Sequence, residues 1–337
     1  MDAKITKKRF SHMLSYDWLK IVGAAVAGIV VWSLIFTMTA TRIRPSQRFT
    51  VFNHTSNISF QSTDYYTLRS QILGDNVFSY EVIETGECDL AATPDYASTL
   101  LETRLVTDEG SVMFIANTND TSTAYQDENG ETKYQTYLES FTSGSFYSYL
   151  ANLDMESEKS SFKKLESYLS KFYTDWKTEI EPDASKVEAE FLARAKKNKD
   201  KRYKTDAQKQ IGIKNDVERI KKYRNALVNV YDYLDKGYIS ITKVEVERED
   251  YYTHEKITLK GYFFNLCPNE ETMGGLKNLV HYPVEYKDEN GKTQTKYIVK
   301  DMHLAFFNLK GVEDGFQYES FLFLDNLVQK YCTELKK

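Results

Sequence analysis

No charged residue interrupts positions 21 to 41, the longest apolar run in the chain. A helix of this length rises about 31 Å, close to the thickness of a bilayer core. The apolar regions of secretory signal sequences are usually shorter, and cleavage after Ala40 would place the large Met38 where a small residue is preferred. The pattern therefore predicts a retained transmembrane helix, with a cleaved signal sequence as the alternative.

Flanking charge predicts the orientation of this span. Lys or Arg residues precede it at positions 4, 7, 8, 9 and 20 and follow it at positions 42, 44 and 48. Because cytoplasmic flanks carry the excess of positive charge, residues 1–20 are expected to form a cytoplasmic tail. The chain is then a single-pass protein of the cell membrane, with its N-terminus inside and its C-terminal part extracytoplasmic.

Between residues 49 and 135, short apolar runs alternate with segments of helical spacing. We predict a strand, a helix, a strand, a helix and a strand, in that order, at 49–52, 62–73, 77–84, 93–110 and 111–117. The second helix has a Thr-Pro start and a Gly end. This order is typical of a small parallel sheet with crossover helices.

From residue 136 to residue 236 the apolar spacing is helical. Helices are predicted at 138–153, at 160–180, from Ser185, which has capping-box spacing with Glu188, and at 206–234. The last of these fits either a short coiled coil with a partner or a helix packed on its own domain.

Alternation with a period of two returns after residue 238. Strands are predicted at 238–249, at 255–267 and, two of them, within 295–309, with a short helix at 272–282 and a closing amphipathic helix at 316–335. The letters "DENG" occur at 127–130 and at 288–291, and both predict tight turns, the second within a hairpin.

The predicted fold class is therefore α/β, with a mixed α+β C-terminal part and a single N-terminal transmembrane helix at 21–41. Residues 49–135 and 238–337 form the α/β lobe or lobes, and residues 136–236 form a large charged helical segment.

Composition adds little to this picture. Charged residues make up 28% and apolar residues 41%, as in ordinary globular proteins, and the net charge is −5. The 25 tyrosines fit either a surface that binds sugar or peptide or aromatic packing in a β-rich core. Cys88, Cys267 and Cys332 allow one disulfide with an odd thiol, or three free thiols.

Basic residues are concentrated in the helical segment. Residues 186–224 hold 14 Lys and Arg against 6 Asp and Glu, a net of +8. Such a surface could meet anionic phosphate in a membrane or a wall polymer, and nucleic acid is not expected outside a cell. The alternative is a solvated helix face with acidic partners in the same chain.

Motifs that would predict catalysis or metal binding are absent from the sequence. No two of the five histidines have the helical spacing of a zinc site, and the chain has no G-x-S-x-G elbow, P-loop or G-x-G-x-x-G turn. We therefore predict a protein that is not an enzyme, with no catalytic residue, metal or cofactor.

Three segments resemble parts of the extracellular solute-binding proteins that serve ABC importers. They are "LLETRLVTDEGSVMFIANTND" at 100–120, "KGYFFNLCPNEETMGGLKNLV" at 260–280 and "GFQYESFLFLDNLVQKY" at 315–331. The first resembles the step from helix to strand in the first lobe of that family. The second resembles a later step from strand to helix, where the chain crosses between lobes, and the third resembles the final helix that packs on a lobe.

This resemblance implies a degenerate member of that family on a single-pass anchor, at the surface of a Gram-positive bacterium. It also implies a non-catalytic binding module for a small polar ligand of the sugar or peptide class, accessory to an ABC transporter or another membrane complex.

In open parallel sheets, ligands bind at the carboxyl ends of the strands. The predicted ends supply Asn53, His54 and Thr55, then Glu84 and Thr85, then Asn117 and Thr118, and Tyr65 and Tyr66 are candidates for stacking on a sugar. A second hypothesis is a membrane-anchored scaffold of a surface complex, with no small-molecule ligand. A cleft lined by aromatic and polar side chains would favour the first hypothesis, and a filled interior with an exposed basic helix face would favour the second.

Overall fold

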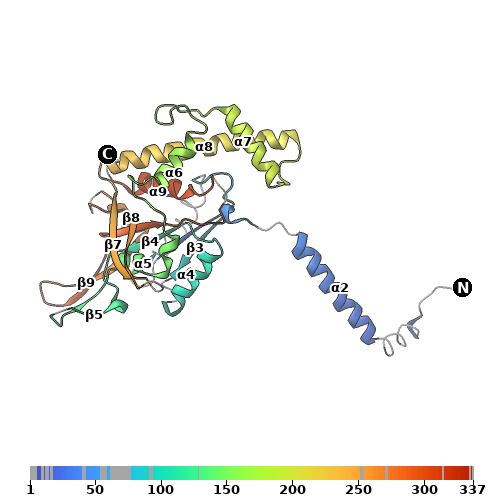
Figure 1. Ribbon diagram of the computed structural model, residues 1–337. Coiled ribbons are helices and arrows are strands. Elements are labelled where there is room, and N and C mark those ends of the chain that lie inside the picture. The colour runs from blue at the N-terminus through green and yellow to red at the C-terminus, as the bar shows by residue number, and fades with distance from the viewer. Residues whose placement is uncertain are drawn as a thin grey trace. The chain divides into compact units, whose positions relative to one another are not determined.

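The structure of the protein is a computed structural model (Figure 1). It describes residues 6–8, 11, 15, 18–39, 43–53, 59–60, 77–90, 94–127, 129–250, 254–269, 272–312, 315–333 and 335. The chain divides into two units, residues 1–43 and residues 44–337, and each is described by itself.

The first unit contains the long helix α2 (Trp18–Thr39), which has 22 residues. Its stretch Trp18–Thr37 is long and apolar enough to cross a membrane. The helix begins three residues before the predicted span, so Trp18 lies within its first turn. Its length and composition fit a membrane anchor and also fit a signal sequence.

Six strands form the main sheet of the second unit, in the order β3-β1-β4-β11-β8-β7. β1 (Arg48–Asn53) lies between β3 (Glu84–Asp89) and β4 (Val112–Ala116) and is parallel to both. β11 (Met302–Phe306), β8 (Lys256–Asn265) and β7 (Ser240–Glu249) extend the sheet by antiparallel pairing. The predicted parallel start and mixed C-terminal part are therefore confirmed, and both belong to one sheet.

Helices cover both faces of this sheet, and Figure 1 shows α6, α8 and α9 on one side of it and α4 on the other. On the first face, α6 (Ser161–Leu169), α8 (Asp206–Asp235) and α9 (Glu319–Tyr331) share a core with Val112 and Phe114 of β4. On the second face, α4 (Ala97–Val106) and α5 (Tyr137–Ser143) share a core with Met113 and Ile115. Alternate side chains of β4 thus enter two different cores, which is why the strand reads as a continuous apolar run.

The predicted strand at 77–84 is wrong, because the strand spans residues 84–89 instead. The alternation in 77–82 has another cause: Phe78 is buried against Phe49, with the ring centroids 4.3 Å apart, and Ser79 and Glu81 are buried as well. β3 itself is a mostly polar, half-buried edge strand, so it has no apolar pattern to detect. The predicted helix at 62–73 lies outside the described residues.

Both "DENG" turns close hairpins. The second joins β9 (Val280–Lys287) to β10 (Thr293–Ile298), and the first joins β5 (Tyr125–Gln126) to β6 (Thr132–Lys133). In each turn the leading aspartate, Asp127 or Asp288, accepts two backbone N–H bonds of 2.9 Å from residues two and four positions later. A short strand, β2 (Ser59–Phe60), pairs with β9.

The first helices of residues 136–236 are shorter than predicted. The segment 138–153 consists of α5 and a 3₁₀ turn, and α6 ends at Leu169. α7 (Ala184–Lys197) is capped by Asp183, whose Oδ1 accepts from the backbone N–H groups of Ser185 and Lys186, so the predicted cap at Ser185 is wrong. α8 has the predicted extent and is capped by Thr205 in a capping box with Gln208.

Five 3₁₀ turns complete the described elements, at Pro45–Gln47, Pro94–Tyr96, Thr121–Thr123, Ser145–Tyr149 and Gly274–Asn278. The last replaces the short helix predicted at 272–282. Cys88, Cys267 and Cys332 form no disulfide with one another.

Candidate functional site

The carboxyl edge of the parallel strands is the first candidate site, and Asn53 is its best-defined residue. Asn53 ends β1 and its side chain is fully buried. Its Oδ1 accepts from the backbone N–H of Leu90 at 3.0 Å, while its Nδ2 has no partner among the residues that the structure describes. An amide donor left unpaired in the interior costs free energy, so such a group calls for an explanation.

Asn117 and Thr118 follow β4 at the same edge. The backbone N–H of Asn117 donates to the Asp301 carbonyl at 2.9 Å, but its buried Oδ1 has no partner in the described part of the chain. The Thr118 carbonyl accepts from the backbone N–H of Tyr137, which anchors the start of α5.

Glu84 and Thr85 lie elsewhere. Because β3 starts at Glu84 rather than ending there, these residues are in register with Arg48 and Phe49 at the amino end of β1. The Glu84 carboxylate forms an ion pair with Arg48, with Nε and Oε2 2.9 Å apart. The structure therefore does not bring them together with Asn53. The other candidates, His54, Thr55, Tyr65 and Tyr66, lie outside the described residues.

Glu87 is a residue of this edge that the sequence prediction missed. It is in register with Val51, and Asp89 with Asn53, so Glu87, Asp89 and Asn53 share one face of the sheet. Both carboxylate oxygens of Glu87 are buried, and neither has a hydrogen-bond partner among the described residues. Burial together with the nearby Asp89 raises the pKa of Glu87 to about 7. The acidic residues of this stretch are visible in the sequence, but only the strand register singles out Glu87.

This raised pKa predicts a pH-dependent stability. The unfolded carboxyl has a pKa of about 4.5, so between about pH 4.5 and about pH 7 the unfolded state loses a proton that the folded state keeps. The free energy of unfolding should therefore fall as pH rises through this window. In Glu87→Gln, which stays neutral, urea unfolding at a series of pH values should show a smaller fall. Identical pH profiles for the two proteins would contradict the assignment.

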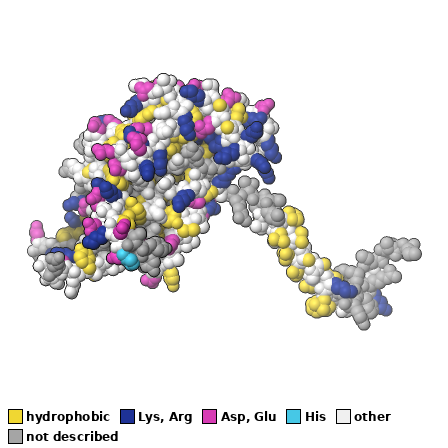
Figure 2. Space-filling view, viewed as in Figure 1, with side chains coloured by type: hydrophobic (Ala, Val, Ile, Leu, Met, Phe, Trp, Pro, Cys, Tyr) yellow, Lys and Arg dark blue, Asp and Glu magenta, His cyan; other side chains and the backbone are white. Residues whose placement is uncertain are grey.

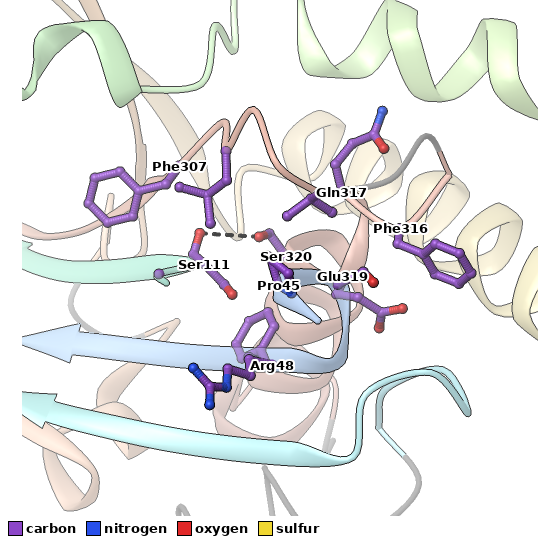
Figure 3. A pocket seen from close by; sticks show the side chains of 13 residues that line it. Pro45, Arg48, Ser111, Phe307, Phe316, Gln317, Glu319 and Ser320 are labelled. Atoms are coloured by element: carbon purple, nitrogen blue, oxygen red, sulfur yellow. Dashed lines mark hydrogen bonds between the residues drawn. The ribbon is translucent and has the colours of Figure 1, made fainter. Parts of the chain in front are cut away.

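A second site to consider is the cavity shown in Figure 3, which lies at the opposite, amino end of the parallel strands. Pro45, Arg48, Ser111, Phe316 and Ser320 are among its lining residues, and the Ser320 hydroxyl donates to the Ser111 carbonyl at 3.3 Å. Its volume is about 30 Å³. This is room for a water molecule or two, whereas ligand pockets usually measure roughly 300–1,000 Å³.

A smaller cavity, of about 10 Å³, lies between Arg44, Glu81 and the segment that joins α7 to α8. We call residues 196–204 the basic loop. Lys196, Lys197, Lys199, Lys201 and Lys204 are exposed there, and none forms an ion pair with any residue that the structure describes. Figure 2 shows Lys and Arg side chains gathered at this end of the α7–α8 hairpin.

Most other basic residues of the helical segment have partners. Lys221 pairs with Glu181 at 2.9 Å, Lys209 with Asp206 at 2.9 Å, and Arg202 with both Asp200 and Glu81. Arg224 donates to the carbonyls of Trp176 and Lys177. The two interpretations of the basic segment thus apply to different parts of it. Five of its exposed lysines without an ion pair among the described residues lie in the basic loop, and Lys214 of α8 is another.

A buried arginine cluster connects the hairpin to the rest of the unit. Arg219 donates from Nε to Asp216 at 2.8 Å, from Nη1 to the Gly315 carbonyl at 2.6 Å, and from Nη2 to the Tyr168 hydroxyl at 2.8 Å. Arg194 of α7 donates to the same Asp216 oxygen at 2.9 Å. Through these hydrogen bonds the cluster joins α6, α7, α8 and the entry to α9.

Within the part of the chain that the structure describes, no group of three or more His, Cys, Asp or Glu side chains is placed to hold a metal ion. The chain matches no protein-family model, no curated protein and no solved structure.

Proposed function

We propose that this protein is a membrane-anchored, extracytoplasmic scaffold whose basic loop docks onto an anionic partner. In this proposal α2 is retained in the cell membrane, residues 44–337 lie outside, and no chemical step is involved. The length and composition of α2 and the excess of Lys and Arg before it support this topology.

The observation that carries the proposal is the unpaired positive charge of the basic loop. It exposes five lysines in nine residues with no acidic partner among the described residues. Uncompensated like charge in one loop is unfavourable on its own, so a bound anionic surface would stabilise it.

Docking of the basic loop predicts protection of its lysines in native membranes. Acylation by a membrane-impermeant amine reagent, followed by mass spectrometry, should modify Lys196, Lys197, Lys199 and Lys201 several-fold more slowly in membranes than in the detergent-purified chain. High salt should abolish the difference, because it screens exposed charge. Four exposed lysines of the β-rich part, Lys256, Lys287, Lys292 and Lys300, serve as internal controls and should react equally in both.

Equal reactivity of the basic-loop lysines in membranes and in detergent would contradict the docking proposal. Absence of a full-length chain from the membrane fraction after alkaline extraction would contradict the anchor.

A second candidate function is a binding module for a small polar ligand, of the solute-binding type and accessory to an ABC transporter. The observation that favours it is a set of polar atoms at the carboxyl edge that have no partner among the described residues: Asn53 Nδ2, Asn117 Oδ1 and the Glu87 carboxylate. A sugar hydroxyl can donate to a carboxylate and accept from an amide, so such a group would satisfy Glu87 and Asn53 together.

A further inference from the structure

We infer that the anionic partner of the basic loop is the lipid surface of the membrane that holds α2. This inference rests on the proposed function in one respect, which is that α2 is retained as a transmembrane anchor. It adds the identity of the partner: anionic phospholipid headgroups, rather than another protein or a free polyanion.

The first step is where the basic loop lies within its own unit. Arg44 Nη2 and Asp200 Oδ2 are 3.9 Å apart, and Asp200 is in the middle of the basic loop. Arg44 also lines the small cavity together with Asn198 and Arg202 of that loop. The basic loop is therefore adjacent to the residue with which the 44–337 unit begins.

The second step is the distance that the chain between α2 and Arg44 can span. α2 ends at Thr39, and Arg44 is five residues later in the chain. A chain advances at most about 3.6 Å per residue, so Arg44 lies within about 18 Å of the end of α2 in any conformation. The linker therefore permits the basic loop to reach the headgroup layer into which α2 emerges.

The third step is charge. Residues 194–204 contain seven Lys and Arg and a single Asp. Five of the lysines are exposed and unpaired among the described residues, and they are spread over a loop rather than converging on a pocket. Ammonium groups on flexible stems suit a diffuse surface of headgroups, whereas recognition of one bound phosphate typically uses converging donors or the planar fork of arginine.

Two exposed apolar side chains of the same hairpin fit this partner. Leu192 of α7 and Ile211 of α8 are 37% and 61% exposed. Large apolar side chains near a group of lysines are typical of helices that lie at a lipid interface, where the apolar groups enter the boundary and the lysines meet the headgroups.

The test uses the full purified chain in lipid nanodiscs, with no other protein present. A fluorophore is placed at Ala207→Cys, in the exposed first turn of α8, in a chain whose Cys88, Cys267 and Cys332 are replaced by serine or alanine. Quenching by headgroup spin-labelled lipid reports the proximity of the hairpin to the membrane. We expect strong quenching in discs containing phosphatidylglycerol, weak quenching in pure phosphatidylcholine, and loss of the difference at high salt.

A charge-reversed variant and a matched control make the test specific. Replacing Lys196, Lys197, Lys199 and Lys201 by glutamate should lower the docked-to-undocked ratio roughly fivefold or more per lysine, the equivalent of about 1 kcal/mol each. Reversing Lys256, Lys287, Lys292 and Lys300 changes the net charge equally and should leave the quenching unchanged.

Equal quenching in both lipids, or equal loss in both variants, would overturn the inference. The lysine-protection experiment in native membranes distinguishes failure of this inference from failure of the proposed function. If protection is seen there but not in nanodiscs, the scaffold has a different anionic partner. If α2 proves to be cleaved, the proposed function itself fails.

Discussion

Replacing Asp216 by asparagine is expected to lower the free energy of unfolding by about 3–5 kcal/mol. Asp216 is buried and bonds to both Arg194 and Arg219. Burial opposes its ionisation, but the two guanidinium groups outweigh this and hold its pKa below the ordinary value. Asparagine keeps the shape of the side chain and removes its charge. The fully buried Arg219 would then lose its carboxylate partner, and its other direct acceptors are the Gly315 carbonyl and the Tyr168 hydroxyl.

Urea unfolding followed by the fluorescence of Trp176 would measure this loss. Trp176 is buried and stacks on Tyr231 of α8, and replacing Trp18 and Trp32 by phenylalanine leaves it as the single reporter. Glu218→Gln, on an exposed position of the same helix, is the matched control and should change stability by less than about 0.5 kcal/mol.

A double variant tests whether the charge is the cause. Arg219→Met alone leaves Asp216 bonded to Arg194 and Tyr80, so it should cost less than Asp216→Asn. Adding Arg219→Met to Asp216→Asn removes the uncompensated cation and should recover part of the loss. Strictly additive losses would show that the two groups do not act through their mutual charge.

The arginine cluster illustrates which parts of the fold were beyond prediction. Asp216 and Arg219 are three residues apart on a helix, the spacing of an ordinary surface ion pair, and nothing local marks them as buried. Their burial follows from segments far away in the sequence, Tyr168 and Gly315, which close over them. Strand and helix order, by contrast, was predictable for β1, α4 and β4. The two strands are continuous apolar runs whose side chains enter both cores, and α4 places its buried apolar residues in one core.

The positions of the candidate site residues were predictable only where the strand that carries them was itself predictable. Asn53 and Asn117 are placed at the carboxyl edge as predicted, because β1 and β4 are apolar and sharply bounded. Glu84 and Thr85 were predicted at the wrong end of their strand. The apolar alternation in residues 77–82 comes from burial against other segments, whereas β3 itself is polar. Glu87 could be found only from the register that aligns it with Val51. The ligand-binding role of all these residues stays a prediction.

α9 differs from its prediction in a way that has a large energetic consequence. The sequence predicts a closing helix with one apolar face, but every residue from Glu319 to Leu324 is buried. A helix that is buried on all sides at one end lies between other layers rather than upon them. In Figure 1, α9 lies between α8 and the sheet, which explains this burial.

Phe321→Ala is therefore expected to lower the free energy of unfolding by about 3–5 kcal/mol, through lost burial and the cavity left behind. The Phe321 ring meets Phe162 of α6 edge-on at 5.3 Å and Phe306 of β11 at 5.5 Å, so its removal takes contacts from both layers. Phe321→Leu keeps most of the volume and should cost clearly less, and Val106→Ala, at an exposed position of α4, should cost less than about 0.5 kcal/mol. The urea assay with Trp176 applies here as well. Similar small losses for all three variants would mean that α9 does not carry the packing between α6 and the sheet, and the helix would then be the peripheral element that its sequence pattern suggests.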